Sequence, residues 1–178
     1  MTITPEQFLK CELEWGIGFH NDQFKALAAA TVEQFKELKI RSVLDFGAGT
    51  GVYSDAAHRA GYEVKVFEIW QSHIDYILEN NPALEIVPKP VTTDLMMFIE
   101  VAEHMTDADL MQLFATITPR YILFSSTSET TSWDVEWGHI NVKQQDEWVA
   151  FFQSIGYRFV KSMNHPTTWA KLFEYGKS

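Results

Sequence analysis

The hydrophobic positions follow two alternating periods along the chain, and this alternation predicts strands separated by helices. Short apolar or alternating runs typical of strands occupy residues 40–46, 62–68, 84–87, 95–99 and 121–124. Apolar residues recur at helical spacing over residues 21–39, 52–60, 72–81, 106–117 and 148–155. An order of strand, helix and strand requires right-handed crossovers. The sequence therefore predicts an α/β, doubly wound fold with a parallel sheet.

Both ends of the chain depart from this regular order. Residues 157–161 and 169–175 have strand patterns, but the connection between them is too short for a helical crossover. We therefore expect an antiparallel hairpin at the C-terminal end. Residues 1–20 contain scattered aromatic positions without a clean period, which indicates a short helix or an N-terminal flap. The polar stretch 125–139 is long for a plain connection and predicts a functional loop or lid.

Composition favours one class of protein and argues against several others. The 178 residues are 46% hydrophobic, which fits a single domain over residues 1–178. The formal net charge of −10 makes a nucleic-acid partner unexpected, because such proteins neutralise phosphates with a basic face. Cys11 is the only cysteine, so neither a disulfide framework nor a cysteine-based zinc site is expected. The sequence has neither a membrane-span pattern nor a signal-peptide pattern, from which we expect a cytoplasmic protein.

Three glycines alternate directly after the first predicted strand. Gly47, Gly49 and Gly51 stand between that strand and a helix, where glycine permits positive φ and lets a ligand lie on the backbone. The spacing differs from the G-x-G-x-x-G of dinucleotide-binding loops, because the position three after Gly49 is Val52. Asp45 precedes the loop, where it would repel a pyrophosphate but would suit a ligand with an ammonium group.

A second acid extends this pattern. Glu68 ends the next predicted strand, at a spacing from the glycines that suits a carboxylate accepting both hydroxyls of a ribose. An acid, a glycine loop and a second acid together describe a site for a nucleoside that carries an amino acid. The glycines alone could form only a tight turn, and Asp45 alone could be a solvated acid, but their combination favours a ligand site.

This combination resembles the class I S-adenosylmethionine-dependent methyltransferases. Their first motif is matched by the acid and the glycines, their second-strand acid by Glu68, and their fourth strand and the segment after it by residues 94–104. The resemblance implies a Rossmann-like, mostly parallel seven-stranded sheet with an antiparallel strand in the C-terminal hairpin, and S-adenosyl-L-methionine as cofactor. It implies cofactor contacts from Asp45, Gly47, Ala48, Gly49, Gly51, Glu68, Trp70 and Glu100. Trp70 either stacks on the adenine or packs as an ordinary aromatic residue, and the compressed segment 82–94 offers no recognisable adenine contact.

Candidate chemistry follows the predicted central strand 95–99. Glu100, Glu103 and His104 lie just past its carboxyl end, which is where ligands bind in doubly wound sheets. Methyl transfer is an in-line displacement that needs positioning and sometimes a base. We predict His104 as the base for a hydroxyl acceptor, because an imidazole pKa lies near the working pH, with Glu103 as the second catalytic candidate.

The same Glu-x-x-Glu-His segment permits a metal. It resembles the metal-binding segment of ubiquinone-biosynthesis O-methyltransferases and of small-RNA 2′-O-methyltransferases, which implies a divalent ion on Glu100, Glu103 and His104. We consider His139, at the end of the loop that carries two tryptophans, as an added ligand. Two carboxylates and one or two imidazoles suit magnesium, manganese or zinc. In the alternative, no metal binds and His104 only forms a hydrogen bond with neighbouring backbone.

The sequence therefore predicts an S-adenosylmethionine-dependent methyltransferase that acts on an oxygen or nitrogen atom of a small molecule. The alternatives are an RNA 2′-O-methyltransferase, a catalytically idle nucleoside-binding module and, last, a nicotinamide-dependent oxidoreductase. The core fold uses nearly all of the length, so the acceptor must be recognised by residues 1–20, by the loop 125–139 or by a partner chain. A homodimer is the assembly that we consider. The predicted acceptor contacts are Phe19, His20, Trp133 and Trp137. We interpret the remaining histidines as surface or packing residues: His58, His73 and His165.

Overall fold

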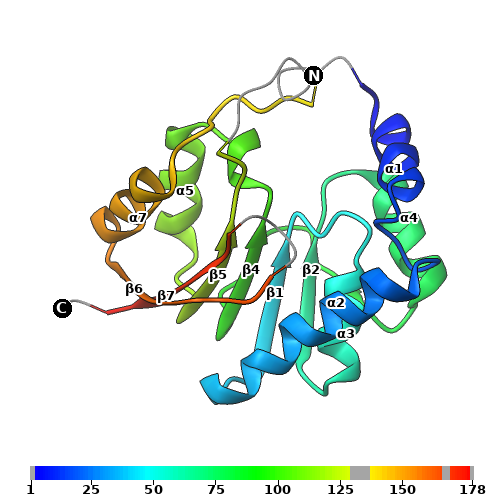
Figure 1. Cartoon of the computed structure of the whole chain (residues 1–178), viewed down its shortest axis with the longest axis horizontal. Coiled ribbons are helices and arrows are strands. Elements are labelled where there is room, and N and C mark those ends of the chain that lie inside the picture. The colour runs from blue at the N-terminus through cyan, green and yellow to red at the C-terminus, as the bar shows by residue number, and fades with distance from the viewer. Residues whose placement is uncertain (1–2, 129–136, 166–168, 177–178) are drawn as a thin grey trace.

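Seven strands form a sheet in the order β3-β2-β1-β4-β5-β7-β6 (Figure 1). The computed structural model describes residues 3–128, 137–165 and 169–176. The strands are β1 (Ser42–Phe46), β2 (Glu63–Phe67), β3 (Glu85–Ile86), β4 (Leu95–Ile99), β5 (Tyr121–Ser125), β6 (Tyr157–Ser162) and β7 (Lys171–Tyr175). Strands β1 to β5 pair in parallel, whereas β7 lies antiparallel between β5 and β6. The predicted mostly parallel seven-stranded sheet with an antiparallel C-terminal strand is confirmed.

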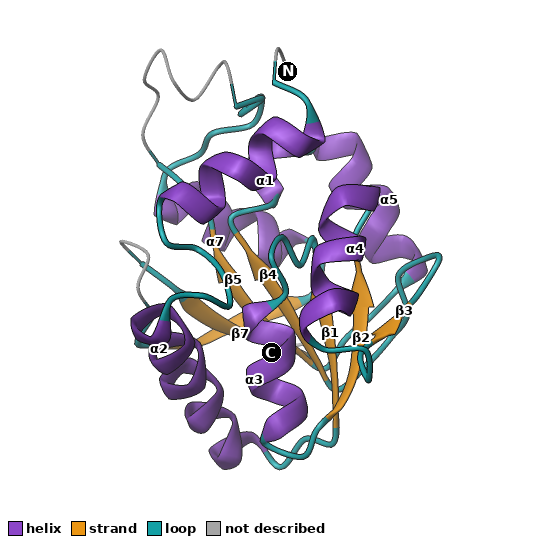
Figure 2. Cartoon of the chain, turned by 90° about the vertical axis from the view of Figure 1, so that its right-hand side faces the viewer, coloured by secondary structure: helices purple, strands orange, loops and turns teal. Residues whose placement is uncertain are grey.

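Helices cover both faces of the sheet (Figure 2). They are α1 (Pro5–Glu14), α2 (Asp22–Glu33), α3 (Val52–Arg59), α4 (Gln71–Asn80), α5 (Asp107–Thr116) and α7 (Gln145–Ser154), with short 3₁₀ turns at η1 (Gln34–Leu38) and η2 (Ala102–His104). Residues of α2, α3 and α4 belong to the core on one face, and residues of α5 and α7 belong to the core on the other. The N-terminal helix α1 packs against α4 rather than on the sheet (Figures 1 and 2).

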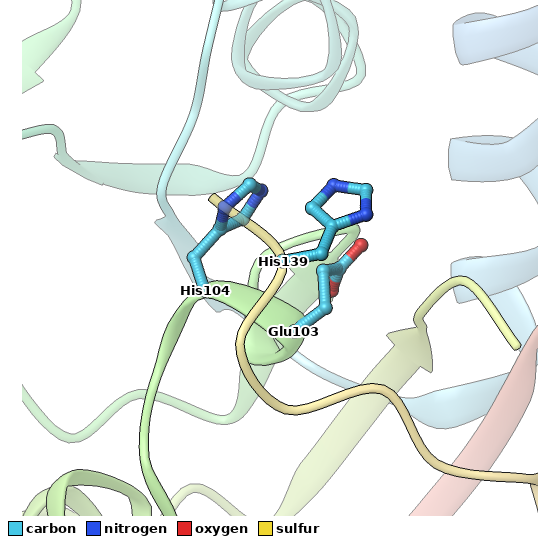
Figure 3. Close-up of side chains that lie close together, drawn as sticks. All are labelled: Glu103, His104 and His139. Carbon is cyan, nitrogen blue, oxygen red and sulfur yellow. The ribbon is translucent and has the colours of Figure 1, made fainter. Parts of the chain in front are cut away.

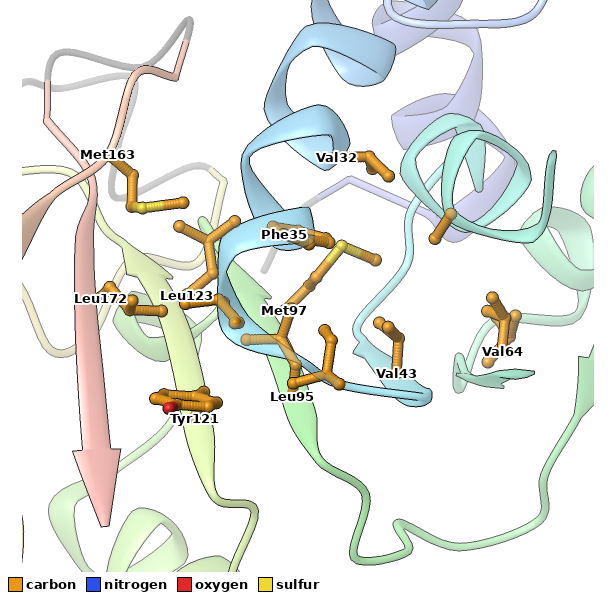
Figure 4. Packing of buried hydrophobic residues seen from close by; sticks show 14 of the residues in the cluster. Val32, Phe35, Val43, Val64, Leu95, Met97, Tyr121, Leu123, Met163 and Leu172 are labelled. Atoms are coloured by element: carbon orange, nitrogen blue, oxygen red, sulfur yellow. The ribbon is translucent and has the colours of Figure 1, made fainter. Parts of the chain in front are cut away.

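The central strands are buried on both faces, as their continuous apolar sequences predict. In β4, Leu95 and Met97 point into one core, whereas Met96 and Phe98 point into the other, and all four are fully buried. Figure 4 shows Leu95 and Met97 packed beside Phe35 of η1. This two-sided burial explains why β4 shows no alternation of polar and apolar residues.

Polar side chains determine where several helices begin. Thr4 and Thr106 each form a capping box, at the start of α1 and of α5, and Asn21 accepts hydrogen bonds from backbone amides at the start of α2. The helix predicted over residues 21–39 is α-helical only to Glu33. It continues as the 3₁₀ turn η1 and ends at Lys39, whose φ is +50°. Within the described residues, no helix is long and apolar enough to cross a membrane.

Candidate functional site

The glycine loop connects β1 to α3 and lies against two other elements. Gly47, Gly49 and Gly51 have φ values of +70°, +54° and +75°, in the left-handed region that favours glycine. A Cβ on Gly47 would lie 2.7 Å from Val101, just after β4, and one on Gly51 would lie 2.6 Å from Ile77 of α4. Glycine therefore permits both the backbone conformation and the close approach of the neighbouring elements.

Glu68 follows β2 directly, and its carboxylate accepts hydrogen bonds from the glycine loop and from its own neighbours. One of its carboxylate oxygens accepts a hydrogen bond from the Gly49 amide at 3.0 Å, and the other accepts from the amides of Ile69 and Trp70 at 2.7 and 2.9 Å. Only 8% of Glu68 is exposed. The two acids and the glycines named by the sequence thus meet at the carboxyl ends of β1 and β2.

Asp45 is buried within β1, beneath the loop. Its carboxylate accepts a hydrogen bond from the Ser54 hydroxyl of α3 at 2.5 Å, and only 5% of the residue is exposed. The pKa of Asp45 is raised from 3.8 to about 7, mainly because burial removes the hydration of the charged form, with a smaller contribution from the negative charge of Glu68 and against the opposing Ser54 hydrogen bond. A cationic group bound nearby would stabilise the charged form of Asp45.

An aromatic cluster, made of Phe8, Trp15, Trp70, His73 and Trp137, lies beside the loop. Trp70 precedes α4, and its ring lies 4.9 Å from that of Phe8 and 5.1 Å from that of His73. Trp137 contacts the rings of Phe8 and Trp15 at 4.6 and 4.9 Å. Trp70 therefore packs between α1 and α4, and a stacking role toward adenine stays a prediction.

His73 differs from the expectation of an ordinary surface or packing residue. It is fully buried, and its Nε2 lies 2.8 Å from a carboxylate oxygen of Glu12 in α1. Sequence reasoning missed this pair because the two residues lie 61 positions apart and belong to no local pattern. The other two histidines agree with the expectation, since His58 is exposed and His165 stacks on Tyr53.

The predicted acceptor residues do not gather at one place. The Phe19 ring packs on that of Tyr76, and its amide donates to the Tyr76 hydroxyl at 3.1 Å. His20 lines a depression of about 470 Å³ on the surface of α1, together with residues such as Leu9 and Leu13. Trp137 joins the aromatic cluster, and Trp133 lies outside the described residues.

Glu103, His104 and His139 converge beyond the carboxyl end of β4 (Figure 3). Each offers one ligand atom, and these atoms lie within 4.8 Å of one another. Backbone hydrogen bonds bring His139 there, because the amides of Ile140 and Asn141 donate to the Glu103 carbonyl at 2.8 and 3.0 Å. The Glu103 side chain is buried and accepts from a serine hydroxyl of the segment after β5 at 2.9 Å.

Glu100 does not belong to this group of three, which corrects the predicted set of four metal ligands. Its backbone has a φ of +54°, unusual for a residue other than glycine. Burial raises the pKa of both the Glu100 and the Glu103 carboxyl groups, and the charge of Glu100 raises that of Glu103 further.

His104 corrects a second expectation. Burial and, to a lesser extent, the neighbouring His139 lower its pKa to about 4, so the imidazole is neutral at neutral pH. The prediction of a base with a pKa near the working pH is therefore wrong. Nδ1 of His104 is buried and has no hydrogen-bond partner in the described part of the chain. A neutral imidazole with an unoccupied nitrogen can accept a hydrogen bond or ligate a metal.

The fold, the glycine loop and the acid after β2 define a class of nucleoside-binding α/β enzymes. A family model described as a methyltransferase domain matches residues 19–162. The chain belongs to the class I S-adenosylmethionine-dependent methyltransferases and has their Rossmann-like fold. A comparison with curated proteins finds no match.

Several solved structures share this fold. The pyocyanin biosynthetic protein PhzM matches with a TM-score of 0.68 and 14% identity over 95% of this chain and 61% of its own. Magnesium protoporphyrin IX methyltransferase from Synechocystis PCC 6803, with bound S-adenosylhomocysteine, matches with a TM-score of 0.64 and 13% identity over 86% of this chain and 83% of its own. Mitomycin 7-O-methyltransferase matches with a TM-score of 0.65 and 15% identity over 99% and 61%. The chain thus spans less than two thirds of two of these proteins.

Proposed function

We propose that this enzyme transfers the methyl group of S-adenosylmethionine to an oxygen or nitrogen atom of a small organic acceptor. The observation that carries the proposal is the group of Glu103, His104 and His139, which lies beyond the end of β4, next to Val101, which packs on Gly47 of the glycine loop. The negative net charge disfavours a polynucleotide acceptor. Support also comes from the names of two structural relatives, mitomycin 7-O-methyltransferase and magnesium protoporphyrin IX methyltransferase.

In this proposal the cofactor binds over the glycine loop. Free amides at the start of α3 and the backbone of residues 47–51 contact its methionyl part, and Asp45 balances its positive charge. The Glu68 carboxylate accepts hydrogen bonds from the ribose hydroxyls. The amides of Gly49, Ile69 and Trp70 donate to the same carboxylate and hold it in a defined orientation. Trp70 and the residues after β2 border the adenine.

The reaction itself requires alignment and one proton acceptor. A lone pair of the acceptor atom attacks the methyl carbon, the carbon–sulfur bond breaks, and S-adenosylhomocysteine leaves with the bonding electrons. The pKa of Glu103 is raised to about 8, so a fraction of this carboxyl group is ionised at neutral pH, and this carboxylate accepts the proton of the acceptor while His104 Nδ1 accepts a hydrogen bond that orients the acceptor. Glu103 is buried and His104 is half-buried, which limits the access of water to the transfer.

In a second form of the proposal, a divalent metal binds Glu103, His104 and His139, and His104 Nδ1 then ligates the ion instead of accepting a hydrogen bond from the acceptor. The three donors fit such an ion, because one carboxylate and two imidazoles suit zinc or manganese and the Nδ1 of His104 lacks another partner among the described residues. When bound, the ion would polarise the acceptor oxygen. Titration calorimetry with zinc, manganese and magnesium tests this idea. His104→Ala should remove binding that an exposed-site variant, His58→Ala, retains, and equal binding by both variants would contradict it.

Transfer of a labelled methyl group from S-adenosylmethionine into a metabolite extract tests the main proposal. We expect a labelled small-molecule product, and we expect Glu103→Gln to lower its formation by roughly a hundredfold or more, the usual effect of losing a general base. Glu79→Gln, at an exposed position of α4, is the matched control. Label that enters only an RNA fraction, binding without turnover, or equal rates for the two variants would contradict the proposal.

A further inference from the structure

The N-terminal helix carries a carboxylate to the glycine loop. A Cβ on Gly49 would lie 3.2 Å from Oε1 of Glu12, so this oxygen sits against the open side of the loop. The other oxygen, Oε2, lies 2.8 Å from Nε2 of His73 in α4. The Glu12 side chain is only 12% exposed, which is unusual for a glutamate near the end of a surface helix.

Several contacts hold Glu12 in this position. His73 is fully buried and shows 0% side-chain exposure, so it forms a fixed partner behind the carboxylate. The ring of Phe8, one turn earlier in α1, packs on those of Trp70 and His73. Among the described residues, α1 therefore meets the rest of the molecule at the edge of the candidate cofactor site rather than on the sheet.

The electrostatic surroundings of Glu12 favour a cation at Gly49. Burial raises the pKa of Glu12, and the negative charge of Glu68 raises it further, although the hydrogen bond and the charge of His73 oppose the shift. Glu68 also raises the pKa of Asp45 across the loop. In the described part of the chain, none of these three carboxylates pairs with a lysine or arginine. A small cationic group between them would relieve this repulsion.

We propose that Glu12 is a cofactor-binding residue, supplied by the N-terminal helix, that accepts a hydrogen bond from the ammonium group of S-adenosylmethionine. The inference rests on the proposed position of the cofactor over the glycine loop. Glu12 Oε1 contacts the ammonium group, and His73 orients the carboxylate through Oε2. The helix α1 thereby closes the methionyl end of the cofactor site, and Glu12 selects ligands that carry an amino group.

Binding of two ligands tests this role. S-adenosylhomocysteine has the ammonium group, whereas its desamino analogue retains the carboxylate and the nucleoside but lacks that group. The variant Glu12→Gln keeps a carbonyl oxygen that can accept from His73, so the fold should persist and circular dichroism can verify it. We expect this variant to bind S-adenosylhomocysteine roughly tenfold to a hundredfold more weakly, the usual effect of losing a charge-assisted hydrogen bond, and the desamino analogue within about twofold of the unmodified protein.

Glu14→Gln is the matched control, because it removes the same charge from the same helix at a side chain that is 61% exposed. Equal affinities of the two variants for S-adenosylhomocysteine would overturn the role of Glu12, and so would an equal loss for both ligands. A lack of S-adenosylhomocysteine binding by the unmodified protein would instead overturn the cofactor position, and the role of Glu12 with it. Glu12→Asp, which keeps the charge but shortens the reach, should bind S-adenosylhomocysteine with intermediate affinity, and full affinity would count against the contact.

Discussion

Replacing Asp45 by asparagine should stabilise the fold increasingly as pH rises. The folded protein raises the pKa of this carboxyl group from 3.8 to about 7, so the folded state binds its proton more tightly than the unfolded chain. Stability is then lost as pH rises between these two values, and the loss is complete above pH 7. The raised pKa lowers the free energy of unfolding by about 4 kcal/mol at pH 8, and about 2 kcal/mol of this loss is already present at pH 5.5.

Urea denaturation at these two pH values measures the effect. The difference in unfolding free energy between Asp45→Asn and the unmodified protein should grow by about 2 kcal/mol from pH 5.5 to pH 8. The test uses the change of this difference with pH, because the contacts of the asparagine amide contribute equally to the free energy of unfolding at pH 5.5 and at pH 8. The Ser54 hydroxyl can still donate to the asparagine carbonyl, so the local structure is retained.

Asp94→Asn provides the control at a second aspartate beside the same sheet. Hydrogen bonds from the Arg41 and Ser42 amides lower the pKa of Asp94, so its stabilising charge is present above its ordinary pKa and is lost only as pH falls further. Its substitution should therefore destabilise the protein equally at pH 5.5 and pH 8. If the Asp45→Asn difference were also the same at both values, Asp45 would titrate normally and the burial argument would be refuted.

Three further substitutions test the local structure by chemical denaturation. Gly51→Ala should destabilise the protein by roughly 2 kcal/mol or more, because a Cβ at this position would lie 2.6 Å from Ile77. The control is Gly61→Ala, which has a similar φ of +90° but no atom within 4 Å of the added Cβ and should cost only about 1 kcal/mol. Equal losses of stability in the two variants would disprove the clash with Ile77. Thr106→Ala removes the hydroxyl that accepts from the Asp109 amide at the start of α5 and should cost about 1 kcal/mol, so an unchanged midpoint would show that the cap is dispensable. Tyr157→Phe removes a buried hydroxyl that donates to a backbone carbonyl at 2.9 Å, and we expect a loss of about 1 kcal/mol without a change in denaturant slope; a stability gain would contradict it.

The parts of the fold with a strong local pattern could be predicted from the sequence. The uninterrupted apolar run of β4 and the alternate glycines after β1 each express a requirement of their own backbone, namely burial on two faces and positive φ. The helix over residues 21–39 was less well predicted, because the change to a 3₁₀ turn at Gln34 depends on packing. Gln34 exchanges hydrogen bonds with the backbone of Asn164, 130 positions away.

The residues of the candidate site that carry a local sequence signal could be predicted, whereas those brought together only by packing could not. Acids at the ends of β1 and β2 follow from strand boundaries, and the parallel arrangement brings them to one edge. The pair of Glu12 and His73 carries no local signal, because α1 and α4 meet only in three dimensions. The sequence predicts both Glu100 and His139 as metal ligands, yet backbone hydrogen bonds bring only His139 to Glu103 and His104.

The sequence by itself determined the order of strands and helices, the glycine loop and the identity of the acids that flank it. The tertiary structure decided which of these groups are charged and which meet. A pKa depends on hydration and on charges from distant segments, so the raised value of Asp45 and the lowered value of His104 arise only when β1 and the end of β4 are buried by elements far away in the chain. Local patterns specify backbone conformation, whereas packing sets the electrostatic environment in which the side chains act.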